Sequence, residues 1–175
     1  MSHIEKIATE LRTLGTGIER ARALAATADH QAQEVALRAA GAGFAAVAAG
    51  MTRVRGAIAA LQGRLGGLTT SIGEATTATA AVPREATPEE TVAGLRPVRE
   101  GIAGLRTASA ATIVQVGDAQ QLVTVVLHGG QPGALLQTLE SVKQVLLQVV
   151  RQTSTAERSV EEATAEARRL GASGT

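Results

Sequence analysis

Residues 135–170 read LLQTLESVKQVLLQVVRQTSTAERSVEEATAEARRL, and this stretch decides the fold. Uncharged apolar or small residues recur in it at alternating intervals of four and three. These positions are Leu135, Leu139, Val142, Leu146, Val149, Thr153, Ala156, Val160, Ala163, Ala167 and Leu170. Because a repeat of about 3.5 residues stays on one side of a slightly underwound helix, the spacing predicts a long helix with one apolar seam, as in coiled coils and helical bundles.

Three further stretches have the same spacing, over residues 4–39, 44–82 and 95–126, and none of their seam positions is ionisable. The second of these seams begins at Phe44. Short connections favour antiparallel neighbours. We therefore predict an all-α fold in which two long antiparallel helical hairpins form an up-down-up-down four-helix bundle or coiled coil, as a single helical domain over residues 1–175.

The first predicted hairpin covers residues 1–82. Ser2 and Glu5 have the spacing of a capping box, so a helix is expected to begin there. The seam shifts register at residues 41–43, Gly-Ala-Gly, where a tight turn or a local break is predicted and a turn is favoured. An ordinary secretory signal would need an apolar core in this N-terminal segment, and the segment has none.

Residues 83–87 are predicted to form a linker, because a proline at position 83 disfavours helix in the residue before it. A second hairpin over residues 88–170 begins with the cap Thr87, a first-turn proline and two glutamates. Pro97 should kink the third helix or delay its start. A glycine-rich turn follows at residues 128–133.

We predict that the chain ends in a frayed tail at residues 171–175. Its longest uncharged stretches are interrupted by Gln, Gly and Pro, so no transmembrane span is expected. We expect a cytoplasmic protein, and leave open an export route that needs no signal peptide.

Composition narrows the classes of function. The 175 residues are 45% apolar and 19% charged, with a formal net charge of +1. Trp, Tyr and Cys are absent, and Phe44 is the only aromatic residue. Without an excess of positive charge or aromatic rings to stack on bases, nucleic-acid binding is not expected. The absence of cysteine excludes disulfides and thiolate metal sites, and the core must be built from aliphatic and small side chains.

Small and bulky residues are predicted to face each other across the bundle. Residues 21–50 are rich in Ala and Gly, whereas residues 113–150 are rich in Val, Leu and Ile. With the turns level at one end, the closed bundle would bring Ala25, Ala28 and Ala32 close to Val145, Leu146 and Val149. Six glycines lie inside the second helix, and close packing against another helix is the favoured explanation for them, with local bending or a partner surface as alternatives.

Only one loop has the composition of a site. His128 precedes Gly-Gly-Gln-Pro-Gly, and the free amides of such a turn could bind an anion. The favoured alternative is structural: Gly129 and Gly130 end the third helix with positive backbone angles, and Pro132 starts the fourth. The pattern matches no nucleotide-binding motif.

Catalytic or metal-binding bundles carry carboxylates or histidines on their inward positions. Here every seam position is apolar, Ser or Thr, and His3, His30 and His128 lie far apart. We therefore predict no enzyme activity, no cofactor and no metal site. The seam hydroxyls are expected to bond backbone carbonyls one turn earlier.

The charge-poor region between Arg106 and Lys143, and the residues just beyond it, are more apolar than one seam requires. Burial against the alanine-rich half is the favoured explanation, and the alternative is an exposed interaction surface for a partner, a second copy or a lipid surface. The candidate surface residues are Val114, Leu122, Val125, Leu127, Leu136, Leu147 and Val150.

The chain resembles an uncharacterised family of small alanine-rich actinobacterial helical proteins in GFAAVAAGM at 43–51, AVPREA at 81–86 and VLHGGQPG at 126–133. The family implies no activity. In layout the first hairpin also resembles the small helical proteins of type VII secretion, whose turn carries Trp-Xaa-Gly. Residues 41–44 occupy that place without Trp, and the chain has no Tyr for the Tyr-x-x-x-Asp/Glu export signal. The resemblance therefore does not imply export by that route, and implies only that the chain could bind a component of such a system.

These features predict a non-enzymatic helical scaffold or adaptor that binds another helical protein, such as a toxin or secretion-system component, or that self-associates. The alternative is an amphipathic coat on a lipid or granule surface, similar to phasins and apolipoproteins. A helical pore former is a third and weaker hypothesis, because no export signal is evident.

Overall fold

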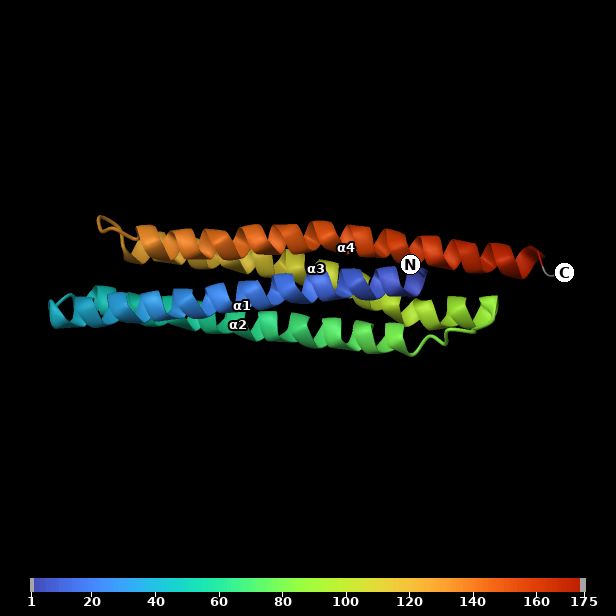
Figure 1. The fold of residues 1–175 in the computed structure, drawn as a ribbon. Coiled ribbons are helices and arrows are strands. Elements are labelled where there is room, and N and C mark those ends of the chain that lie inside the picture. Colours follow the sequence, from blue (N-terminus) through green and yellow to red (C-terminus); the bar gives the residue numbers. More distant parts are fainter. Residues whose placement is uncertain (1, 174–175) are drawn as a thin grey trace.

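Four long helices make up the computed structural model, which describes residues 2–173 (Figure 1). They are α1 (His3–Gly41), α2 (Ala45–Ala80), α3 (Pro88–Val126) and α4 (Gly133–Ser173). About 90% of the described residues are helical and none of them lies in a strand. The predicted all-α class is therefore confirmed, and the three breaks lie within about two residues of their predicted positions.

Two helix starts have the capping boxes that their sequences indicate. At α1 the Glu5 N–H donates to Ser2 Oγ (3.2 Å) and the Ser2 N–H donates to Glu5 Oε2 (2.9 Å). At α3 the Glu90 N–H donates to Thr87 Oγ1 (3.2 Å) and the Thr87 N–H donates to Glu90 Oε2 (2.8 Å). These backbone hydrogen bonds favour the ionised carboxylates and lower the pKa of both glutamates.

Each helix packs against two neighbours. Helix α1 contacts α2 and α4, and α3 contacts the same two helices, whereas the backbones of the diagonal pairs α1 and α3 or α2 and α4 do not come within 8 Å between Cα atoms in the described residues. The two turns lie at one end of the bundle, and the linker with the outer ends of α1 and α4 lies at the other (Figure 1). This is the closed up-down-up-down bundle predicted from the four seams.

The seams form one continuous core. Nearly all of their apolar residues are buried, including Leu11, Ile58, Ile102 and Leu146 from the four helices. Phe44 is an exception near the turn between α1 and α2, where its side chain is 63% exposed. Leu170, at the opposite end of the bundle, is the other large seam residue that stays exposed, at 57%.

Hydroxyl side chains follow the predicted local pattern. Thr79 and Thr112 each donate to the carbonyl four residues earlier (2.8 and 2.7 Å), and Thr153 donates to the carbonyl three residues earlier (2.6 Å). The Ser109 Oγ is buried and has no hydrogen-bond partner among the described residues, so the prediction is wrong for this residue.

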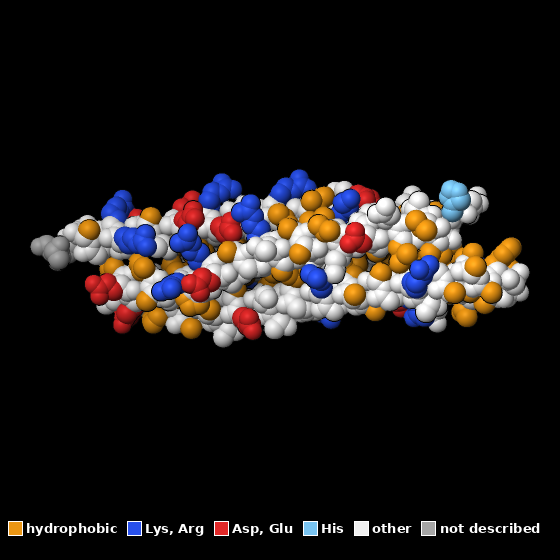
Figure 2. All heavy atoms as spheres, turned by 180° about the vertical axis from the view of Figure 1, so that it is seen from behind, with side chains coloured by type: hydrophobic (Ala, Val, Ile, Leu, Met, Phe, Trp, Pro, Cys, Tyr) orange, Lys and Arg blue, Asp and Glu red, His pale blue; other side chains and the backbone are white. Residues whose placement is uncertain are grey.

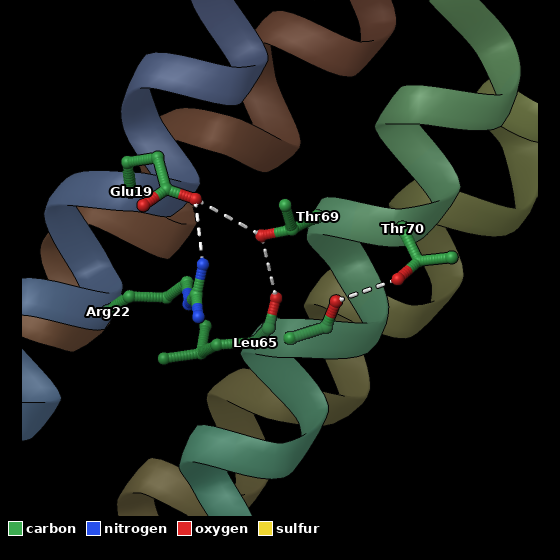
Figure 3. Close-up of polar contacts among 6 residues, drawn as sticks. Glu19, Arg22, Leu65, Thr69 and Thr70 are labelled. Atoms are coloured by element: carbon green, nitrogen blue, oxygen red, sulfur yellow. Dashed lines mark hydrogen bonds and ion pairs between the residues drawn. The ribbon is translucent and has the colours of Figure 1, made fainter.

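Threonine also links α2 to α1. The Thr69 hydroxyl lies 3.3 Å from the Leu65 carbonyl oxygen and 3.4 Å from Glu19 Oε1, which also accepts a hydrogen bond from Arg22 (Figure 3). The neighbouring Thr70 hydroxyl donates to the carbonyl one turn earlier (Figure 3). The threonine-rich part of α2 is therefore held by backbone acceptors within its own helix and by a carboxylate on α1.

The two hairpins are staggered along the bundle axis (Figure 1). Lys6 Nζ lies 3.2 Å from Glu162 Oε2, and α4 continues beyond this pair to Ser173, whereas α1 begins only three residues before Lys6. At the other end, Val126, the last residue of α3, contacts Gly50. The first hairpin therefore projects beyond the second at the turn end, and the second projects at the linker end.

This stagger corrects the predicted pairing of α1 with α4. A Cβ placed on Gly17 would lie 2.8 Å from Val149 Cγ2, and Lys6 pairs with Glu162. In this register Ala25 lies opposite about residue 143, within a turn of Val145, whereas Ala28 and Ala32 lie opposite about residues 140 and 136, more than a turn from their predicted neighbours. The prediction placed the two turns level, but the linker is long enough to let α3 start beyond the end of α2.

The glycines of α2 are mostly not explained by close packing. A Cβ on Gly50 would lie 2.6 Å from Val126 Cγ1, which supports that explanation at one position. Nothing lies within 4 Å of the corresponding point at the other five, which are Gly56, Gly63, Gly66, Gly67 and Gly73. At these positions the prediction of close packing is wrong.

Two helix ends differ from the prediction. Helix α3 begins at Pro88 and continues through Pro97, so its start is not delayed. Helix α4 extends through Gly171 to Ser173, where a frayed tail was predicted; residues 174–175 of that tail lie outside the described residues. The extension has local support, because Gly171 packs beside Pro88 and the Ser173 hydroxyl donates to the carbonyl one turn earlier (2.7 Å).

Candidate interaction surface

Helices α3 and α4 meet along a second line of contact outside the core, which we call the outer seam. It is formed by one row of residues on each helix, spaced seven apart. The rows are Val92, Arg99, Arg106, Ile113 and Gln120 on α3, continued by Leu127 just past its end, and Leu136, Lys143, Val150, Glu157, Thr164 and Gly171 on α4. Arg106 Nη1 lies 3.2 Å from Glu157 Oε2, which shows that the two rows face each other.

The structure divides the seven predicted surface residues among three sides of the second hairpin. Leu127, Leu136, Leu147 and Val150 are half-buried on or beside the outer seam. The other three lie elsewhere. Val114 and Val125 are on the outward side of α3, at 64% and 65% exposure. Leu122 continues the row of Gly94 and Gly101, which packs against α2. Burial against the core thus explains part of the apolar excess, and the seven residues do not form one patch.

A groove of about 1070 Å³ opens on the outer seam at the linker end. It occupies the part of α3 and α4 that extends toward the projecting end of the second hairpin. Small and apolar side chains make up much of its lining, which includes Val92, Ala93, Leu95, Ala103, Ala165 and Ala167. This groove is hollow because the outward positions between the two helices carry alanine and glycine where larger residues would fill the space.

Charged groups of both signs surround the groove. Arg96 and Glu100 form an ion pair (3.1 Å) on the α3 side. The side chains of Arg99, Glu161 and Arg168 also line the groove, and none of the three forms a hydrogen bond or ion pair within the described residues. A bound segment could therefore place apolar residues in the groove and pair its own charges with these groups.

The Arg106–Glu157 pair separates the groove from the more apolar half of the outer seam. A second polar bridge lies within that half, where Gln120 Nε2 donates to Glu140 Oε2 (2.9 Å). The hydrogen bond from Gln120, together with one from Gln144, favours the ionised form and lowers the pKa of Glu140. The outer seam thus has a groove at one end and half-buried leucines and valines at the other.

The turn around His128 has the geometry of a helix end. Gly129 has a positive φ of 83°, as predicted, but Gly130 does not; its N–H donates to the Leu127 carbonyl (2.8 Å). The Pro132 carbonyl accepts from Leu136 in the first turn of α4. Among the described residues, no group of three or more His, Asp or Glu side chains is placed to hold a metal ion.

The sequence reasoning missed the groove. The sequence features that indicate the groove are small residues at outward positions on both helices, Ala103 on α3 and Ala165 on α4. Gly171 is a third such residue, but its position in the predicted tail concealed its role. Such residues become informative only when the two rows are known to face each other.

No helix in the part of the chain that the structure describes combines the length and apolar character needed to cross a membrane. No curated protein matches the chain, and no solved structure does. One family model matches, described as "Family of unknown function (DUF6244)", and it covers residues 86–172. The chain is therefore similar to this family over α3 and nearly all of α4, the two helices that form the outer seam.

Proposed function

We propose that the protein is a non-enzymatic helical scaffold or adaptor that binds a helix of another protein along the outer seam of α3 and α4. The observation that carries this proposal is the groove, whose small apolar lining and unpaired charges of both signs suit an amphipathic helix. The half-buried Leu147 and Val150 extend the apolar contact along the same helix pair. A toxin or a secretion-system component, in an actinobacterial context, is the partner class that the sequence resemblances favour.

The closed bundle makes a protein partner the better hypothesis than a lipid surface. An amphipathic coat would have to separate the hairpins to expose the four core seams, which are buried in this arrangement. A helix bound in the outer seam requires no such opening. Lipid binding is therefore kept as an alternative outcome of the experiment.

A groove variant and a matched control test the proposal. Ala165 lines the groove and is exposed, and Ala60 is an exposed alanine on the outward side of α2. Ala165→Glu places a charge and added bulk in the groove, whereas Ala60→Glu makes the same change elsewhere. We expect native-lysate pull-downs with the wild type and Ala60→Glu to retain a common helical protein, and Ala165→Glu to lose it.

Two results would contradict this function. Repeated recovery of no partner by the wild type would count against an adaptor, and recovery of the same partner by Ala165→Glu would exclude the groove as its binding site. Flotation of the purified protein with liposomes or polyester granules, accompanied by a change in its circular dichroism, would favour the coat protein instead. Thermal melts of both variants should show an intact bundle.

A further inference from the structure

The stagger leaves the end of the first hairpin beyond the ends of α3 and α4. Helix α3 ends at Val126, which packs against Gly50, so Ala45–Ala49 lie beyond the end of α3. Helix α4 begins at Gly133, and the antiparallel register set by the Lys6–Glu162 pair places this start opposite about residue 35 of α1. We call residues 35–49 the free tip.

The core seam continues into the free tip with less cover than in the rest of the bundle: Ala39 is still buried, at 8% exposure, but Phe44 is not. Phe44 precedes the buried Met51 by seven residues, in the same seam of the second stretch, yet its side chain is 63% exposed. Val35 and Val47, the adjoining seam residues of α1 and α2, are only partly buried. The inner side of the free tip is thus an apolar seam of two helices where the rest of the bundle has four.

The free tip carries a single charged side chain, Arg38. Residues 39–52 contain no ionisable side chain, and the nearest charges are Arg38 and Arg53 on either side. Figure 2 shows the same trend, with Lys, Arg, Asp and Glu side chains concentrated toward the linker end and mostly hydrophobic or uncharged atoms at the turn end. Two identical surfaces of this kind can meet without bringing like charges together at their centre.

We propose that the free tip binds the free tip of a second copy of this chain about a two-fold axis. The space beside each free tip, beyond the ends of α3 and α4, is here called the step. The tip of each copy would occupy the step of the other, so that two tips complete a short intermolecular four-helix bundle with Phe44, Val35 and Val47 at its centre. The fit follows from symmetry, because the step and the projecting tip have the same length in both copies. Apart from Leu37 and Arg38, the remaining tip positions are alanine and glycine, which allow the helices to approach closely.

The opposite end of the bundle does not offer an equivalent step. There the linker lies along the projecting α3: Val82 is 7% exposed, and its Cγ2 lies 3.0 Å from the place of a Cβ on Gly94. A free tip inserted at that end would have to displace the linker. Association is therefore tip to tip and closes as a dimer, whereas head-to-tail contacts would continue into a filament.

Three variants, each adding one negative charge, test this interface. Phe44→Asp alters the centre of the proposed contact, and Asp is a favoured residue at the N-cap of α2, which Phe44 occupies without a side-chain hydrogen bond. Leu37→Glu is the matched control, because Leu37 is equally exposed at 66% on the same tip but lies outside the seam. Leu170→Glu changes the exposed seam residue at the opposite end.

Sedimentation equilibrium over a range of concentrations gives the readout, with thermal melts to confirm that each variant is folded. We expect the wild type, Leu37→Glu and Leu170→Glu to approach twice the monomer mass of 17.8 kDa. Phe44→Asp should weaken dimerisation at least about tenfold. A wild type that stays monomeric up to about 1 mM, or a folded Phe44→Asp that dimerises normally, would overturn the proposal. Masses that grow beyond a dimer and are reduced by Leu170→Glu would indicate head-to-tail assembly and also overturn it.

Discussion

Replacing Gly17 with alanine should destabilise the protein, although the same change usually stabilises a helix. A Cβ at this position would lie 2.8 Å from Val149 Cγ2, closer than carbon atoms pack in protein interiors. Val149 is fully buried, and its β-branched side chain has one preferred rotamer in a helix, so it cannot turn away without strain. Overpacking of this kind costs about 1–3 kcal/mol.

The helical preference of alanine offsets part of this cost. Removing a glycine from a helix interior gains about 1 kcal/mol, so we expect a net decrease of up to about 2 kcal/mol in the free energy of unfolding of Gly17→Ala, and no net gain. Gly56→Ala is the control, because nothing lies within 4 Å of a Cβ at that position. It should show the propensity gain alone, an increase of about 0.5–1 kcal/mol.

Urea unfolding followed by circular dichroism measures both changes, provided that the dependence on denaturant stays the same as in the wild type. For a protein of this size each kcal/mol should also move the melting temperature by about 2–4 °C. If Gly17→Ala is as stabilising as Gly56→Ala, then α1 and α4 do not approach closely at Gly17. The register derived from this contact, and with it the stagger of the hairpins, would then be refuted.

Two further predictions concern the core and the helix starts. Ala28→Phe adds a ring at a fully buried position and should lower the free energy of unfolding by about 1–3 kcal/mol, measured by urea unfolding; an unchanged stability would mean that the hairpins do not close over Ala28. The pKa values of Glu5 and Glu90 are lower in the folded protein than in the unfolded chain, where they are about 4.5. The two carboxylates therefore contribute fully to stability above that unfolded-state pKa, and their contribution is lost as the pH falls through the folded-state pKa values. Melting temperatures measured at successively lower pH should therefore fall in this acid range, and a Glu5→Gln, Glu90→Gln variant should show a smaller decrease; equal decreases would contradict the assignment.

Local features of the fold were predictable because their signals are short and physically direct. The capping boxes at Ser2 and Thr87 need residues only three apart, and the glycine and proline breaks act on the backbone next to them. The seams were predictable for a related reason: an apolar residue every three or four positions has to be buried on one side of a helix. These rules act within a few turns of one element.

The candidate interaction surface was predicted less well. Leu147 and Val150 do lie by the outer seam, but Leu122 faces α2 and Val125 points outward on α3. The groove lined by Ala103 was missed. Which residues share a surface depends on how two helices are rotated and aligned against each other, and hydropathy along one helix does not contain that information.

The sequence by itself determined that this chain forms four long helices, where they begin and end to within a turn, and which side of each is buried. Only the tertiary structure decided how far the hairpins slide along each other. Apolar seams repeating every seven residues can pack in several registers that differ by whole repeats, and side-chain packing with the path of the linker selects one. That selection places Gly17 against Val149 and leaves Phe44, a core residue by its spacing, exposed at the free tip.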